Sequence, residues 1–404
     1  MKLSDIQYIT GSESKIDKRT FTVVPYSPVF IGSGMSMRKG LDFYSRQGLT
    51  HFFDHQKIYK RYLNDIDALE QALLKGALDR YIIDKGDNSS EFIKQTVTGD
   101  VLGQELMQPV RDGFGNPILP GSSLKGSIRT ALFSGLLKER KLKSADYEKL
   151  ISGRKVGGSK LESELLSTAS RRGKEPNFDL GRVFRISDAT FNKTDLEVFN
   201  SVVVNQTNCG YRYKVMGRSS SNSEHLSEAT YISVLALSFD ADLVQPADIS
   251  ISIDNTALKA INWKGSFNFE YIARACNTLS ERLIKYERDY FNEAVQDIAV
   301  LETINEEYEY LLEDVQQCIN DTENGKIIWM QRVGWGSGWL SMTGGHGFLS
   351  RPDGKEYIES LKKVAHFLFK KTKGFEYPKT RKVVLDIAQK PSSAMGWILV
   401  EQKT

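Results

Sequence analysis

The segment 119–132 constrains the fold more than any other part of this chain, because a turn and a helix start follow each other directly in it. A Pro-Gly pair makes the turn, and either Ser122 or Ser123 can cap the N-terminus of a helix. Apolar residues then recur at every fourth position, at Leu124, Ile128 and Leu132. This spacing predicts a helix from Ser122 to about Lys138 that buries one face.

Two cations project from the neighbouring stripe of the same predicted helix. Lys125 and Arg129 are four residues apart and therefore lie on one face. Free backbone N–H groups, the hydroxyls of Ser122 and Ser123 and these cations meet at the helix start, a combination that suits a phosphate or another oxyanion. A capped amphipathic helix with solvated cations explains the same pattern equally well. The segment is thus a candidate phosphodiester site.

Two glycine-rich loops do not fit a nucleotide-binding P-loop. That motif ends in Gly-Lys followed by Ser or Thr, whereas Lys125 precedes Gly126 here. The loop 153–160 has the glycine spacing but ends Gly-Ser-Lys and follows no clear strand. The sequence therefore gives no support to an ATPase function.

Charge is segregated along the chain, although the formal net charge of the 404 residues is +3. Residues 121–190 contain 15 lysines and arginines against 8 aspartates and glutamates, whereas residues 289–325 contain 11 acidic residues and no lysine or arginine. Such segregation is expected of a protein that follows an anionic strand on one side, with chance clustering as the alternative. The acidic stretch would repel RNA, so it is either a solvated face or a protein contact.

Cysteine and histidine usage argues against disulfides and metal chemistry. The three cysteines are scattered without a Cys-x-x-Cys pair. His51 and His55 have i, i+4 spacing, but the phenylalanines between them favour a strand, in which the two rings would lie roughly 13 Å apart. We expect no metal and no cofactor. The sequence also lacks a signal-peptide apolar region and any run of roughly 18 apolar residues, so we expect a cytoplasmic protein without a membrane contact.

Two further segments combine glycine with groups suited to RNA. A Gly-Ser-Gly turn is predicted after a strand from Phe21 to Ile31, and a Gly-Trp-Gly-Ser-Gly-Trp loop occupies 334–339. Glycine permits close backbone approach. Trp335 and Trp339 either stack bases, which contributes about 1–3 kcal/mol per base in single-strand binders, or fill the core beneath the loop. The candidate RNA contacts are Gly32, Ser33, Gly34, Arg332, Gly334, Trp335, Gly336 and Gly338.

Tyrosines alternate with the cations Arg212 and Lys214 in the segment 211–214. On an extended chain the two cations fall on one face and the tyrosines on the other. The cationic face either contacts phosphates or belongs to an edge strand with solvated charges. Both cations are therefore candidate RNA contacts.

Three of these blocks resemble motifs of the RAMP superfamily, whose members build the type III CRISPR effector complexes. The blocks are Val24–Gly34, Pro120–Arg129, which contains Pro-Gly-Ser-Ser-Leu-Lys-Gly, and Val333–Trp339. They follow the order of the superfamily and span most of the chain. The length and the tryptophan-containing loop are most similar to the family of fifth subunits of the subtype III-A (Csm) complex.

The resemblance implies an α+β fold with two ferredoxin-like (RRM-like) domains that carry helical and loop insertions. The first expected domain is 1–220, with an insertion around 141–176. The second is 221–404, with a helical insertion around 267–320. We expect the boundary near residues 218–226.

The resemblance also implies a function. The expected protein is a non-catalytic subunit that binds CRISPR RNA (crRNA), caps a filament of related subunits and supports maturation of the crRNA 3′ end by recruiting nucleases. Its expected partners are crRNA, the other RAMP backbone subunits, the small subunit of the Csm complex and host ribonucleases, in the cytoplasm of a prokaryote.

A metal-independent endoribonuclease is the alternative, because related processing enzymes of the superfamily use a histidine as general acid or base. His346 follows the glycine-rich loop and is the candidate catalytic residue, with the pair His51 and His55 as second choice. No diagnostic partner residue accompanies His346. A protein scaffold without RNA contact is a third hypothesis.

Overall fold

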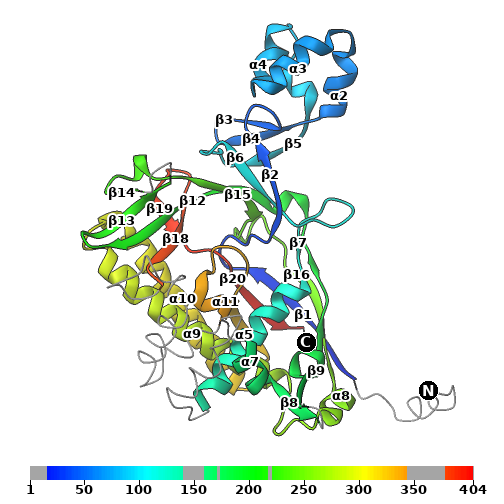
Figure 1. Cartoon of the computed structure of the whole chain (residues 1–404), viewed down its shortest axis with the longest axis vertical. Helices are drawn as coiled ribbons and strands as arrows, with labels where there is room; N and C mark the ends of the chain where they lie inside the picture. Colours follow the sequence, from blue (N-terminus) through cyan, green and yellow to red (C-terminus); the bar gives the residue numbers. More distant parts are fainter. Residues whose placement is uncertain (1–15, 140–158, 171–172, 217–220, 344–377, 404) are drawn as a thin grey trace, which may run out of the picture.

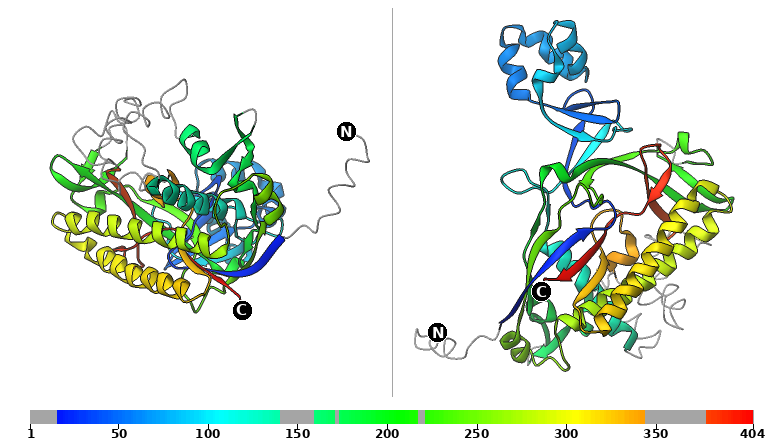
Figure 2. Two further views of the ribbon diagram at one scale, coloured as in Figure 1. Left: turned by 90° about the horizontal axis from the view of Figure 1, so that it is seen from below. Right: turned by 180° about the vertical axis from the view of Figure 1, so that it is seen from behind.

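The computed structural model describes residues 16–139, 159–170, 173–216, 221–343 and 378–403 (Figure 1). Helices and strands are mixed throughout these residues, so the predicted α+β class is confirmed. Two large sheets form the main body, and a smaller module extends from one end of it (Figures 1 and 2).

One sheet has five antiparallel strands and contains both ends of the described chain. Its order is β10 (Phe184–Ile186), β16 (Ala247–Asp254), β1 (Ile16–Pro25), β20 (Trp397–Gln402) and β17 (Ile328–Arg332). The helices α5 (Gly121–Glu139) and α9 (Phe269–Ala294) pack on it. Alternate residues of β1, such as Phe21 and Val23, are fully buried, as the period of a strand requires. The Phe21 ring centre lies 5.5 Å from that of Phe269 on α9.

The second sheet has eight strands, with the long strand β12 (Leu196–Thr207) at its centre. β12 pairs antiparallel with β13 (Gly210–Val215), β15 (Ile232–Leu237) and β18 (Thr380–Leu385). β15 pairs in parallel with β6 (Glu105–Pro109), and β2 (Gly32–Arg38) pairs with β6 as an edge strand. The remaining strands are β14 (Ser221–Ser223) and β19 (Pro391–Ser393).

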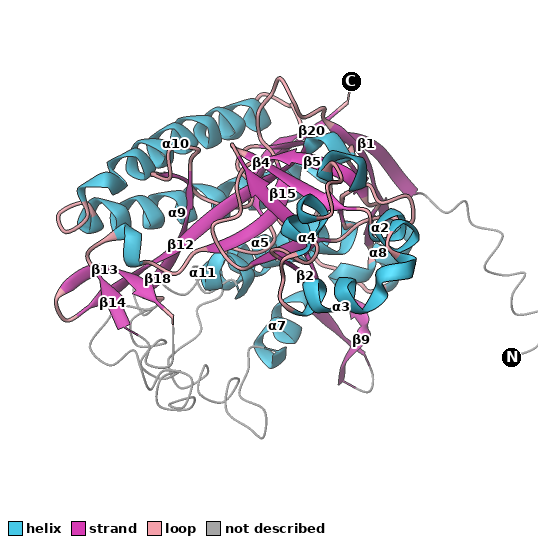
Figure 3. Ribbon diagram, turned by 90° about the horizontal axis from the view of Figure 1, so that it is seen from above, coloured by secondary structure: helices cyan, strands magenta, loops and turns pink. Residues whose placement is uncertain are grey.

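Two long helices, α9 and α10 (Glu302–Glu323), run side by side along one side of the main body (Figure 3). The Asn268 side chain caps α9 by accepting the N–H of Tyr271 at 2.8 Å. The buried positions of α10 recur at spacings of three and four, which is the stripe that a packed helix needs. The helical structure predicted around 267–320 is therefore confirmed, as two long helices.

The module at the end of the molecule has a core of its own. A three-stranded sheet of β3 (Phe43–Arg46), β4 (Leu49–Phe53) and β5 (Ile93–Thr98) carries α2 (His55–Arg61), α3 (Ile66–Leu74) and α4 (Leu78–Asp84). Phe53, Ile58, Leu69, Leu78 and Ile82 pack together beneath these helices. The strands β2 and β6 lie between the module and the main body (Figure 1).

Short elements complete the described chain. β7 (Ile118–Leu119) pairs with β11 (Ala189–Thr190), and β8 (Ser167–Ser170) pairs with β9 (Gly173–Asp179). The short helices are η1 (Leu63–Asp65), η2 (Ser89–Phe92), α7 (Ser159–Leu166), η3 (Leu180–Arg182), η4 (Lys193–Asp195), η5 (Leu226–Glu228), α8 (Asn255–Ala260), η6 (Ala299–Leu301) and α11 (Gly338–Thr343).

The structure corrects one local prediction. The segment 32–34 is not a turn after a strand: β1 already ends at Pro25, and Gly32 begins the edge strand β2, whose register shifts between Gly32 and Ser36. The insertion expected around 141–176 includes regular structure, since α7, β8 and most of β9 fall in it, while 140–158 and 171–172 lie outside the described residues.

The two ferredoxin-like domains and a boundary near 218–226 stay predictions. Each large sheet takes strands from both sides of that boundary. β1 lies beside β20 in one sheet, and β12 lies beside β18 in the other. Any division of the chain into domains has to keep these long-range pairs together.

Candidate nucleic-acid interface

The three glycine-containing blocks meet at one place, which we call the motif junction. The N–H of Trp335 donates to the carbonyl of Phe30 at 2.9 Å. The hydroxyl of Ser127 on α5 donates to the carbonyl of Arg332 at 3.0 Å. The approach to β2, the first half of α5 and the glycine-rich loop are therefore joined by direct hydrogen bonds.

Gly334 is required at the motif junction by its backbone conformation and by its neighbour. Its φ is +77°, and a Cβ at this position would lie 2.5 Å from the Phe30 carbonyl oxygen. Gly334→Ala should therefore lower the free energy of unfolding by about 1–3 kcal/mol. Gly48→Ala is the matched control, because Gly48 has φ +76° and open space around the missing Cβ. Equal losses of thermal stability in the two variants would contradict the close approach at Phe30.

The Arg332 side chain binds the glycine-rich loop 334–339 instead of facing solvent. The residue is 6% exposed. Its Nε donates to the Met395 carbonyl at 2.8 Å, and its Nη2 donates to the Gly336 carbonyl at 3.3 Å. Its guanidinium carbon lies 5.5 Å from the centre of the Trp397 ring. The prediction that Arg332 contacts RNA is not supported by this geometry, because the guanidinium is committed to holding the loop.

The two tryptophans of the loop are partly buried. The Trp335 ring meets Phe30 edge-on, with 6.1 Å between ring centres, and Nζ of Lys382 lies 4.4 Å from the centre of the same ring. Trp339 packs against the main core. Gly336 packs on Met395, whereas Gly338 is exposed; both have positive φ, +91° and +80°. Lys382 therefore covers one face of the Trp335 ring.

The N-terminus of α5 is already occupied by a carboxylate of the chain. The helix begins at Gly121, and the Gly121 N–H donates to Oδ1 of Asp188 at 2.7 Å. Ser122 and Ser123 are residues of the first turn, and the Ser123 N–H donates to the Pro120 carbonyl at 2.9 Å. The prediction that these serines cap the helix is therefore wrong. Asp188 provides the negative charge that the helix dipole favours.

Arg129 is held by acidic side chains. Its Nη2 donates to Oδ2 of Asp179 at 2.7 Å, and its Nη1 donates to the other oxygen of that carboxylate. Its Nε donates to Glu162 at 2.6 Å. The guanidinium beside Asp179 holds the pKa of that half-buried carboxyl below its usual range, against the effect of burial. The prediction of Arg129 as a free phosphate-binding cation does not fit this pairing.

Lys125, unlike Arg129, forms no ion pair with a carboxylate among the described residues. Its Nζ lies 5.1 Å from the centre of the Phe184 ring. Partial burial lowers the pKa of Lys125, and the positive charges of Arg129, Arg185 and Arg182 lower it further, while the carboxylate of Asp179 opposes them. Arg182 and Arg185 are exposed. We call Lys125 and Arg185 the α5 cation cluster.

A groove of about 720 Å³ lies beside the exposed strand β2 and is named the β2 groove. Three cations from three separate segments line it: Lys94 of β5, Arg111 in the loop after β6, and Lys193 of η4. Lys94 and Lys193 are exposed, and Nη1 of Arg111 donates to the Gly115 carbonyl at 2.8 Å. No acidic residue belongs to the described lining of this groove. Its charge therefore favours an anion.

The predicted glycine-serine segment contributes Ser33 to the lining of the β2 groove. Ser33 donates from its hydroxyl to the Gln108 carbonyl at 3.0 Å. Gly32, Ser33 and Gly34 are all exposed, and Gly34 has φ +83° with open space around it. Met35, 71% exposed, adds an apolar surface to the same groove. The groove therefore offers cations and a hydroxyl group to phosphates, and an apolar surface to bases.

Arg212 and Lys214 lie on β13 as the alternation predicts, because Tyr211 and Tyr213 are buried on the opposite face. Arg212 is paired, however: its Nη2 lies 2.7 Å from Glu224, and its Nη1 lies 3.8 Å from Asp297. Lys214 is partly buried. A phosphate contact of Arg212 would have to displace these carboxylates.

His51 and His55, the candidate histidines among the described residues, each contact a different neighbour. His51 of β4 hydrogen-bonds Thr96 at 2.9 Å, while His55 at the start of α2 lies 3.3 Å from Asp42. His346 lies outside the described residues. Across the ranges that the structure describes, no group of three or more His, Cys, Asp and Glu side chains could hold a metal ion. No helix in those ranges is both long and apolar enough to span a bilayer.

Three glycine-containing blocks converge beside basic surfaces in this fold. Comparison with known proteins tests which class of protein has this combination. The family model of the RAMP superfamily matches residues 25–316, and the chain belongs to that superfamily. No curated protein matches the sequence.

Two solved structures have the same fold. A chain of the cryo-EM structure of a Csm–crRNA–target RNA ternary complex from a type III-A CRISPR-Cas system is 22% identical, with a TM-score of 0.61, and the match covers 95% of this chain and 100% of that one. The crystal structure of Csm5 from T. onnurineus is 21% identical, with a TM-score of 0.55, and the match covers 94% of this chain and 99% of that one.

Sequence patterns missed much of the basic surface. Lys94, Arg111 and Lys193 stand in three distant segments, and nothing local distinguishes them from solvated charges. Arg182 and Arg185 belong to the stretch 121–190, whose excess of lysine and arginine indicated a basic surface. The charge count was therefore the only sequence signal for these two residues.

Proposed function

We propose that this chain is a non-catalytic RNA-binding subunit of a type III-A (Csm) CRISPR complex. Membership of the RAMP superfamily and the likeness to Csm structures support this assignment. The observation that carries it is the β2 groove, where three cations from separate segments converge and no described lining residue is acidic.

In this proposal the groove binds the sugar-phosphate backbone of crRNA. Lys94, Arg111 and Lys193 neutralise phosphates, while Ser33 and the exposed glycines beside it admit the chain closely. The α5 cation cluster makes a second phosphate contact. Since these contacts address the backbone, sequence preference is weak and affinity falls steeply with salt.

The proposed place in the complex is the end of the backbone filament. There the subunit would contact other RAMP subunits and the small subunit, and it would support maturation of the crRNA 3′ end by recruiting nucleases. Omitting the chain from a reconstituted complex should leave crRNAs with longer 3′ ends when they are sized on a denaturing gel. Identical crRNA lengths with and without the chain would contradict this role.

Fluorescence anisotropy with a labelled single-stranded crRNA tests the binding function directly. We expect log K to fall linearly with log salt, and no cleavage of the RNA in EDTA. Cleavage that a His346→Ala change abolishes would instead establish the endoribonuclease. No salt-dependent binding would favour the protein scaffold.

Alanine substitutions of Lys125 and of Arg129 should have different effects. Lys125→Ala should weaken RNA binding several-fold and reduce the salt slope by about 0.7, the contribution of one phosphate on a single strand. Arg129→Ala should instead cost about 2 kcal/mol of stability, because Asp179 loses its charged donor. Anisotropy and thermal unfolding of both variants separate the two roles. A loss of RNA affinity in Arg129→Ala at unchanged stability would restore the original assignment.

A further inference from the structure

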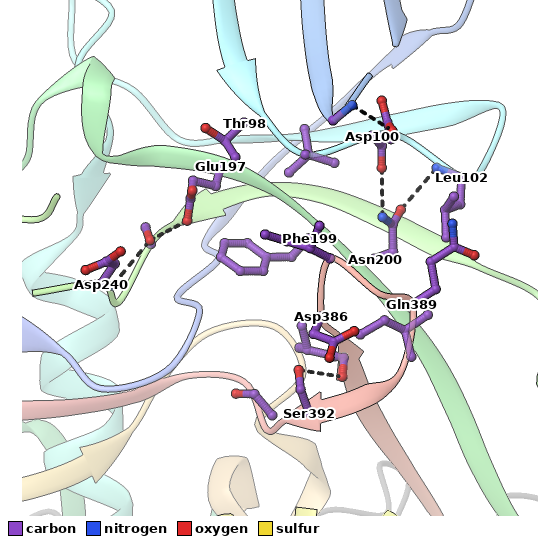
Figure 4. A pocket seen from close by; sticks show the side chains of 18 of the residues that line it. Thr98, Asp100, Leu102, Glu197, Phe199, Asn200, Asp240, Asp386, Gln389 and Ser392 are labelled. Carbon is purple, nitrogen blue, oxygen red and sulfur yellow. Dashed lines mark hydrogen bonds between the residues drawn. The ribbon is translucent and has the colours of Figure 1, made fainter. Parts of the chain in front are cut away.

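A second cavity, of about 520 Å³, differs from the β2 groove in charge, because its charged lining residues are acidic. It lies between β12, the loops that follow β5 and β15, and the β18–β19 hairpin (Figure 4). Phe199 of β12 stands between these walls in Figure 4, and its ring centre is 6.3 Å from that of Phe239. Phe239 is 43% exposed, and Ile387 at the hairpin tip is 91% exposed. Exposed large apolar groups beside a cavity are typical of an interaction site.

The charged groups of this cavity are all acidic. Asp100, Glu197, Asp240 and Asp386 line it, and the described lining contains no lysine, arginine or histidine. None of the four has an ion-pair partner among the described residues. Asp240 and Asp386 use one oxygen each to accept a backbone N–H, from Asp242 at 2.9 Å and from Lys390 at 2.8 Å. Their charge is therefore not neutralised within the described chain.

We propose that this cavity, the acidic pocket, binds an extended segment of another protein that carries an arginine or lysine next to a large apolar residue. The apolar side chain packs on Phe199 and Phe239, and the cation faces Asp240 and Asp386. A guanidinium can also stack on the aromatic faces. Charge complementarity of this kind selects the partner and speeds association.

An RNA strand is the wrong occupant. Four carboxylates repel phosphates, and no described lining group could neutralise one. A purely apolar peptide would leave the carboxylates desolvated and unpaired, which costs binding energy. A cationic and apolar segment satisfies both features at once.

Selection from a display library of random 12-residue peptides on the purified full-length chain tests the proposal. We expect selected peptides to share an arginine or lysine adjacent to Leu, Ile, Met, Phe or Trp. Anisotropy with a selected, labelled peptide then gives its Kd. The double variant Asp240→Asn with Asp386→Asn should weaken that peptide at least fivefold, because asparagine keeps the accepting oxygen and removes the charge. Ile387→Ser should weaken it as well.

Two controls make the outcome decisive. Asp67→Asn, on the exposed surface of α3, should leave peptide affinity unchanged, and the double variant should bind single-stranded RNA as the wild type does. Selected peptides without a cation, equal peptide affinity in the double variant, or competition for the peptide by RNA would each overturn the proposal. Because the experiment measures peptide binding, the test of this proposal does not depend on whether the chain binds RNA.

Discussion

Arg381→Ala should lower the free energy of unfolding by about 3–5 kcal/mol, which is the range for breaking a buried ion pair. Arg381 of β18 and Glu287 of α9 form an ion pair whose side chains are 7% and 5% exposed. The Arg381 guanidinium also lies 4.3 Å from the centre of the Tyr290 ring. Truncation would leave the Glu287 carboxylate buried without a counter-charge, at the contact between the second sheet and the long helices. Urea unfolding followed by circular dichroism measures the loss.

A double replacement distinguishes charge pairing from packing. Arg381→Met combined with Glu287→Leu removes both charges and keeps apolar volume, so it should cost less than the single alanine variant. Arg80→Ala is the exposed control, because the Arg80–Asp84 pair has side chains 83% and 70% exposed; it should change stability by less than about 0.5 kcal/mol. A cost below about 1 kcal/mol for Arg381→Ala would show that the pair is not structural.

The double variant Lys94→Ala with Lys193→Ala should have the largest effect on RNA binding. Both residues are exposed and line the β2 groove, Lys94 from β5 and Lys193 from η4. Removing two phosphate contacts should reduce the salt slope by about 1.4 for a single strand. At low salt, affinity should fall by roughly 10- to 100-fold. Anisotropy titrations between low and high salt measure both quantities.

A control of equal charge excludes a general electrostatic effect. Lys259→Ala with Lys264→Ala removes the same charge at exposed positions on and just after α8, at the opposite end of the molecule from the small module (Figure 1). This control should bind RNA nearly as the wild type does. If both double variants lose affinity alike, the groove is not the RNA site, and net charge explains the binding.

Local patterns predicted the elements of this fold well where the pattern was strong. The apolar spacing of Leu124, Ile128 and Leu132 predicted α5, and all three residues are buried. The alternation around Arg212 predicted the two faces of β13. Gly32–Gly34 was less predictable, because glycine and serine fit both a turn and an exposed edge strand, and β6 decided between them.

The RNA-contact assignments depended on information that local sequence does not contain. The sequence does not show whether the side chain of a lysine or arginine faces solvent or a carboxylate. Arg129 meets Asp179, which is 50 residues away, and Gly121 meets Asp188, which is 67 residues away. Arg212 and Arg332 are likewise committed to groups that their own segments do not reveal.

The sequence by itself determined the α+β class, the helix after the Pro-Gly turn, the helical region around 267–320 and the superfamily, because each depends on residues close together or on short motifs. The tertiary structure alone decided which cations remain available to an anion and which stabilise the fold. It brought Lys94, Arg111 and Lys193 into one groove and paired Arg129 and Arg381 with carboxylates. The physical reason is that Coulomb attraction depends on distance in space, and folding sets that distance between residues far apart in the chain.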